Sequence, residues 1–212
     1  MMVVAVAGLL AVCTAAPAPG LVRTVRLERT DSLVALFETG RTWEAFLAAA
    51  NARRSTWEDN YGRGAVTDSA LIARARAVGG WRILVVAEDW CGDSANTIPY
   101  LARLVERAPD LELRIVNSTA GKWVMERYRT SDGRAATPTV VVLDRDGAAQ
   151  GCLIERPRAL KEWIVANQPK LSEEDYRTQR IEWYRNDAGG HTVAEIVAIL
   201  EAAVQGTPVC VP

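Results

Sequence analysis

Continuous apolar runs and amphipathic stretches alternate along the middle of the chain. The runs at 83–87 and 140–143 contain only aliphatic residues, as is typical of strands buried on both faces of a sheet. The segment 111–116 predicts another strand, and helical patterns separate the strands. Alternating units of this kind favour a parallel core with right-handed crossovers. The turn at Asp144-Arg145-Asp146-Gly147 predicts a hairpin, which makes the sheet mixed.

Helices are expected on either side of this core. Thr42 is expected to cap a short alanine-rich helix over 43–50, and Thr67-Asp68 to cap a second helix that precedes the central strand. Two further helices, beginning at Ser172 and Thr192, should form a hairpin that packs back on the domain or faces a partner.

The segment 51–64 interrupts the helical pattern. It has no apolar period and contains Trp57 and Tyr61 among charged residues. We expect a surface loop, either a connection pinned by these two aromatic residues or part of a binding site.

The sharpest change of pattern follows the run at 83–87. There Trp90-Cys91-Gly92-Asp93-Ser94 separates a buried strand from a helix. Unpaired N–H groups and the positive end of the helix dipole favour a negatively charged sulfur at such a position. Cys91 is therefore a candidate nucleophile. Pro99, eight residues further on, is expected to kink the helix.

A second proline motif, Thr137-Pro138-Thr139, immediately precedes the run at 140–143. Together with Trp90-Cys91-Gly92 and Pro99, it resembles the thioredoxin superfamily over roughly residues 67–168. Trp90-Cys91-Gly92-Asp93 is similar to the motif of bacterial thioredoxin-like proteins that lack a second active-site cysteine. The resemblance implies an α/β thioredoxin-like fold, in which a central mixed sheet is flanked by helices, with N-terminal helical additions and a C-terminal helical hairpin.

The resemblance also implies roles for the site residues. Pro138 should follow a cis peptide bond and face Cys91, while the backbone of Thr137 pairs with a bound substrate segment. The Ser94 hydroxyl is expected to donate a hydrogen bond to the sulfur and to favour the thiolate, whereas the charge of Asp93 opposes it. The catalytic candidates are thus Cys91 and Ser94, and the substrate-binding candidates are Trp90, Gly92, Asp93, Thr137 and Pro138.

Two departures from ordinary thioredoxins affect the same half-reaction, the release of the mixed disulfide. Ser94 stands where the resolving cysteine is expected, and Val85 replaces the buried acid six residues before the nucleophile. An external thiol would have to release a mixed disulfide at Cys91. We therefore expect a monothiol thiol-disulfide oxidoreductase, whose partners are a disulfide-containing protein or a small glutathione-like thiol. The alternative is a redox-inactive thioredoxin-fold binding module.

A third hypothesis is an iron–sulfur carrier, because Cys91-Gly92-Asp93-Ser94 is similar to the Cys-Gly-Phe-Ser of monothiol glutaredoxins. The Gly-Gly-x-Asp motif that binds glutathione in that family is absent after the strand at 139–143, where the chain has Asp144-Arg145-Asp146-Gly147-Ala148. This disfavours the carrier hypothesis, and neither a cofactor nor a metal site is expected.

The four cysteines contain no C-x-x-C pair and do not indicate a disulfide scaffold. Cys152 falls in a predicted strand, where it is expected to be a small buried hydrophobic residue rather than a resolving thiol. Cys210 lies in a proline-flanked tail and could reach a partner.

Length and composition indicate one soluble domain with additions. We divide the 212 residues into a possible signal or lipoprotein-like segment (1–20), an N-terminal extension (21–66), the thioredoxin-like domain (67–168) and a C-terminal helical extension (169–212). The net charge of −1 offers no basic face for nucleic acid. The ten apolar residues at 3–12 are too few for a stable membrane span but suit a secretory signal. Export to the periplasm is expected, with the cytoplasm as the alternative.

Overall fold

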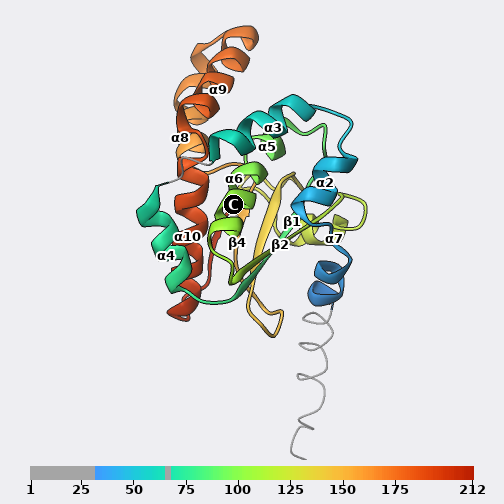
Figure 1. Cartoon of the computed structure of the whole chain (residues 1–212). Coiled ribbons are helices and arrows are strands. Elements are labelled where there is room, and N and C mark those ends of the chain that lie inside the picture. Colours follow the sequence, from blue (N-terminus) through green and yellow to red (C-terminus); the bar gives the residue numbers. More distant parts are fainter. Residues whose placement is uncertain (1–31, 65–67) are drawn as a thin grey trace, which may run out of the picture.

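The computed structural model describes residues 32–64 and 68–212 (Figure 1). Its five strands form one sheet in the order β2-β1-β3-β4-β5. They are β1 (Trp81–Val86), β2 (Leu111–Val116), β3 (Thr139–Leu143), β4 (Ala149–Ile154) and β5 (Val209–Val211). Strands β1 and β2 are parallel, β3 is antiparallel to both of its neighbours, and β5 is parallel to β4. The predicted mixed α/β sheet is confirmed.

Helices surround the sheet and also extend beyond its ends. A first helical segment covers residues 32–39. It is followed by α2 (Trp43–Ala49), α3 (Arg54–Arg63), α4 (Ser69–Ala77), α5 (Gly92–Ala95), α6 (Ile98–Arg107), α7 (Lys122–Arg127), α8 (Arg158–Asn167), the short 3-10 helix η2 (Gln168–Lys170), α9 (Glu173–Asp187) and α10 (Gly190–Val204). The helical additions expected at both ends of the core are therefore confirmed.

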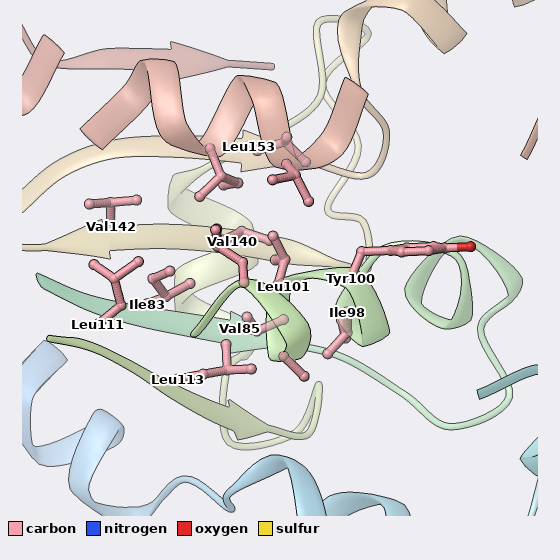
Figure 2. Packing of buried hydrophobic residues seen from close by; sticks show 14 of the residues in the cluster. Ile83, Val85, Ile98, Tyr100, Leu101, Leu111, Leu113, Val140, Val142 and Leu153 are labelled. Atoms are coloured by element: carbon pink, nitrogen blue, oxygen red, sulfur yellow. The ribbon is translucent and has the colours of Figure 1, made fainter. Parts of the chain in front are cut away.

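Each central strand buries side chains on both of its faces, which explains the continuous apolar runs in the sequence. On one face, Val85 and Val140 belong to a large cluster with residues of α4, α6 and α10, and Figure 2 shows side chains of this cluster. On the other face, Leu84 and Val141 pack with the helical segment at 32–39 and with α7. The sheet is thus a rigid base for the loops at its end.

The helix after Cys91 is divided rather than kinked. Helix α5 ends at Ala95, and α6 begins at Ile98 after two intervening residues, with Pro99 in its first turn. Proline is well tolerated there because the first N–H groups of a helix have no partner within it. The expected kink at Pro99 is replaced by a break at Asn96 and Thr97.

The expectation of a loop over 51–64 is wrong, because α3 forms there. Trp57 is completely buried and packs near Trp43 and Phe46, with ring centroids 6.1 and 5.1 Å away. The other buried residue of α3 is Asn60, and Tyr61 packs partly buried against the same core. Because the buried face of α3 is narrow and includes the polar Asn60, the sequence of this segment shows no helical period of apolar residues.

The C-terminal hairpin packs back on the domain through its second helix. Helix α10 buries Val193, Ile196 and Leu200 in the same core as the central strands. Gly189 is the N-cap of α10 and has φ of 77°. A Cβ there would lie 2.1 Å from the Tyr100 ring, so only glycine fits. Helices α8 and α9 extend beyond the body of the molecule in Figure 1.

The expectations for the last two cysteines need correction. Cys152 in β4 is buried, as expected, but it forms a disulfide with Cys210 in β5. The two residues are register partners in the parallel pair of strands. Strand β5 has only three residues, so its pairing was not evident from the sequence.

The expected signal or lipoprotein-like segment at 1–20 lies outside the described residues. Within the described residues, no helix combines the length and the apolar character needed to cross a bilayer.

We predict that replacing both Cys152 and Cys210 by alanine lowers the free energy of unfolding by about 2–4 kcal/mol, because the disulfide closes a long loop. The sequence separation of the two cysteines is 58 residues. Urea titration of the wild type and the variant measures the difference. Wild type with added reductant is the control and should lose as much stability. Equal stability with and without the disulfide would contradict the prediction.

Candidate functional site

Cys91 lies where the connection after β1 enters α5. It is the N-cap of α5, and its sulfur accepts a hydrogen bond from the backbone N–H of Ser94 at 3.4 Å. The sulfur also donates to the carbonyl oxygen of Thr137 at 3.3 Å, and the Thr137–Pro138 peptide bond is cis. Cys91 is partly exposed and is the one free cysteine among the described residues. The structure therefore brings Cys91, Ser94 and the Thr137–Pro138 loop together.

The contact between Ser94 and the sulfur differs from the one expected. The hydroxyl of Ser94 is buried and has no hydrogen-bond partner in the described part of the chain. The backbone N–H binds the sulfur instead, since an N-cap side chain points at the N–H groups of the first helical turn. The expectation that the hydroxyl donates to the sulfur is wrong.

The two residues that flank Cys91 leave it accessible. Trp90 is 61% exposed, which is unusual for so large an apolar side chain. Gly92 faces the guanidinium of Arg53, whose Cζ would lie 3.8 Å from a Cβ added at Gly92. An exposed indole ring therefore precedes Cys91 in the chain, and a cation lies beside the residue that follows it.

The carboxylate of Asp93 is held in a nearly buried cluster. It accepts hydrogen bonds from Arg156 at 2.7 and 3.1 Å and from the Tyr184 hydroxyl at 2.8 Å. Burial, together with the charge and hydrogen bond of Asp93, raises the pKa of Tyr184 well above its usual value. Burial alone would lower the pKa of Arg156, but Asp93 and Glu155 outweigh it and raise that pKa. The Asp93 side chain therefore anchors α5 to α9 and to the residues before α8.

A second anchor joins the connection after β1 to the segment before α3. The Asp89 carboxylate accepts the backbone N–H groups of Asn51 and Ala52 at 2.8 and 3.0 Å. The hydrogen bonds from Ala52 and Asn51 lower the pKa of Asp89 below its usual value. The indole N–H of Trp57 donates to the Asp89 carbonyl at 3.1 Å, and Arg53 Nε donates to the Trp90 carbonyl at 2.7 Å.

Asn60 holds the break between α5 and α6. Its side-chain amide donates to the carbonyl of Ala95 at 2.8 Å and to Asn96 Oδ1 at 3.0 Å. Its oxygen accepts the Tyr100 hydroxyl at 3.0 Å, and burial raises the pKa of Tyr100 to about 12. A buried polar residue of α3 therefore binds one backbone carbonyl at the end of α5 and one side chain in the break.

Sequence reasoning missed the residues that support the site from outside the motif. Arg53, Asn60, Arg156 and Tyr184 carry no motif of their own, and their contacts span 35 to 91 residues. The one available signal was the mixture of aromatic and charged residues at 51–64. In the described part of the chain, no group of three or more histidine, cysteine or carboxylate side chains is arranged to hold a metal ion.

The fold and the site define a class of protein: a mixed sheet flanked by helices, with a cysteine at a helix start that faces a cis-proline loop. Residues 40–177 match the family described as Thioredoxin, and the chain belongs to that family.

Solved structures share this fold. One is a protein of unknown function from Pseudomonas aeruginosa, 23% identical with a TM-score of 0.61. Another is an HIV epitope-scaffold protein, 24% identical with a TM-score of 0.60. Each comparison covers 80% of this chain and 97% of the other. No curated protein matches the chain significantly.

We predict that Asp93→Asn lowers the free energy of unfolding by about 2–4 kcal/mol, because it leaves the nearly buried Arg156 without its main counter-charge. The matched control is Glu58→Gln, which removes an exposed ion pair with Arg54 and should change stability little. Chemical denaturation of the three proteins measures the effect. Equal losses in the two variants would contradict the anchoring role.

The Tyr184 contact also predicts a dependence on pH. The pKa of Tyr184 is higher in the folded protein than its ordinary value of 10.0, so folding favours the protonated phenol. This contribution to stability is complete below pH 10 and is lost as the pH rises further. Tyr184→Phe should therefore lose less stability than wild type over that alkaline range, as measured by urea titration at several pH values. If wild type and Tyr184→Phe lost the same stability as the pH rises, the result would contradict this prediction.

Proposed function

We propose that the protein is a monothiol member of its family that exchanges disulfides through Cys91. The observation that supports this best is the geometry of the sulfur. It is partly exposed, lies 3.4 Å from a backbone N–H donor and 3.3 Å from the carbonyl beside a cis-proline. The Cys152–Cys210 disulfide leaves Cys91 as the free thiol of the described chain.

The proposed reaction has two stages. The Cys91 thiolate attacks one sulfur of a substrate disulfide, a bond forms between the two sulfurs, and the other substrate sulfur leaves as a thiolate. Because Ser94 cannot resolve the mixed disulfide, the thiolate of a small thiol attacks the substrate sulfur and releases the Cys91 thiolate. A second small thiol then releases the substrate thiol. One disulfide is reduced by two electrons, and two small thiols become a disulfide.

Several residues support substrate binding beside the sulfur. The carbonyl oxygen of Thr137 accepts a hydrogen bond from the Cys91 thiol. When the thiol ionises, this carbonyl loses its hydrogen-bond donor. An extended substrate segment beside Pro138 would supply a backbone N–H in its place. The exposed Trp90 ring would border that segment. The proposed partners are a disulfide-containing protein and a small thiol.

We also propose that the protein works in an oxidising compartment after export. The apolar run at 3–12, followed by small residues, supports this, and so does the Cys152–Cys210 disulfide. Protein purified from its native host should begin near Pro17 or at a lipid-modified Cys13. Mass spectrometry of the N-terminal peptide tests this, and an intact Met1 would contradict export.

The exchange reaction is tested by replacing the residues at the two positions of the motif. Wild-type protein mixed with a small disulfide should form a long-lived adduct on Cys91, which an added thiol discharges. Ser94→Cys should shorten the life of the adduct, because the new thiol can form an intramolecular disulfide with Cys91. Cys91→Ser should form no adduct. Mass spectrometry of the peptides measures adduct position and lifetime.

The matched control for Ser94→Cys is Ser94→Ala, which fills the same buried position without a thiol. Its adduct should live as long as that of the wild type. No adduct at Cys91 in folded protein would contradict the exchange reaction and favour a redox-inactive binding module.

A further inference from the structure

Arg53 reaches the site from the segment before α3. Its backbone is left-handed, with φ of 53° and ψ of 26°, a conformation that costs a residue other than glycine about 1–2 kcal/mol. The neighbouring hydrogen bonds from Asn51 and Ala52 to Asp89 hold the segment in this position. The side chain then turns toward the motif, and its Nε donates to the Trp90 carbonyl at 2.7 Å.

The rest of the guanidinium lies over Gly92. Its Cζ, Nη1 and Nη2 would be 3.8, 3.9 and 4.0 Å from a Cβ at Gly92, so the three atoms are nearly equidistant from that point. Gly92 follows Cys91 directly. A guanidinium anchored through Nε still has four N–H groups on Nη1 and Nη2, arranged to bind both oxygens of a carboxylate.

The carboxylates closest to Cys91 in sequence are all engaged elsewhere. Glu88 accepts the N–H and hydroxyl of Ser118, Asp89 accepts two backbone N–H groups, and Asp93 binds Arg156 and Tyr184. Within the described residues, Arg53 forms no ion pair with any carboxylate. The Arg53 guanidinium beside the motif is therefore exposed to solvent, while the three nearby carboxylates are bound to other groups.

We propose that Arg53 binds a carboxylate carried by the small thiol that reacts at Cys91, so that the site selects anionic thiols and their disulfides. This deepens the proposed exchange reaction, on which it rests. The guanidinium is fixed at its Nε end, so a carboxylate bound at its outer nitrogens is held beside Gly92, the residue that follows Cys91. Arginine suits this role better than lysine because its planar fork binds both carboxylate oxygens.

Two alkylating reagents of similar size test the charge preference. Iodoacetate carries a carboxylate and iodoacetamide a neutral amide. With either, the Cys91 thiolate forms a sulfur–carbon bond as the carbon–iodine bond breaks and iodide leaves. The measured quantity is the ratio of the iodoacetate rate to the iodoacetamide rate at Cys91, read from its peptide by mass spectrometry. The ratio cancels changes that affect both reactions alike.

Arg53→Asn should lower this ratio roughly five-fold, which is the upper range for an exposed ion pair. Asparagine tolerates the left-handed backbone, so the variant should fold. The matched control is Arg54→Asn, next along the chain, whose side chain pairs with Glu58 and should not affect the ratio. Raising the salt concentration should lower the wild-type ratio toward that of Arg53→Asn.

Two results would overturn the proposal: an unchanged ratio in Arg53→Asn, including the case in which both rates fall equally, or a wild-type ratio that does not respond to salt. The salt measurement uses wild-type protein alone, so it stands even if the variant fails to fold. Alkylation needs no disulfide exchange. Absence of a mixed disulfide would therefore refute the proposed function, whereas an unaltered alkylation ratio would refute the role of Arg53.

Discussion

The position of Cys91 depends on hydrogen bonds that fix the connection between β1 and α5 from two sides. Asp89 accepts hydrogen bonds from N–H groups of the segment before α3. Asp93 accepts hydrogen bonds from Arg156 and Tyr184 in the C-terminal part of the chain. Between these two carboxylates, the N-cap geometry aims the sulfur at the N–H of Ser94. Residues outside the motif thus hold the motif in place, and a charge that seemed to oppose a thiolate serves as an anchor.

The sequence predicted the parts of the fold that depend on local pattern. Both-face burial produced the apolar runs of β1 and β3, and Pro138 before a strand pointed to the loop that faces Cys91. What it did not predict depends on long-range pairing. Helix α3 buries only Trp57 and Asn60, and β5 is a three-residue strand that joins β4 through Cys210. Neither feature leaves a periodic signal, because tertiary contacts stabilise both.

The site shows the same division. Residues of the motif lie together as expected, but Ser94 binds the sulfur through its backbone N–H. Its hydroxyl is buried and has no hydrogen-bond partner in the described part of the chain. Arg53 and Tyr184 join the motif across 37 and 91 residues of sequence, where no local pattern indicates a contact. The additions on each side of the core therefore contribute to the site, and the Cys152–Cys210 disulfide secures the last strand while Cys91 remains a thiol.

The proposed function requires that the fold make Cys91 reactive toward disulfides. The most direct measurement compares the rate at which Cys91 reacts with a neutral aromatic disulfide in the native protein and in the urea-unfolded protein at the same pH, with Cys91→Ser subtracted as background. We expect a faster reaction in the native protein, because the partly exposed sulfur accepts a hydrogen bond from the Ser94 N–H, which favours the thiolate. An equal or slower native rate would contradict it.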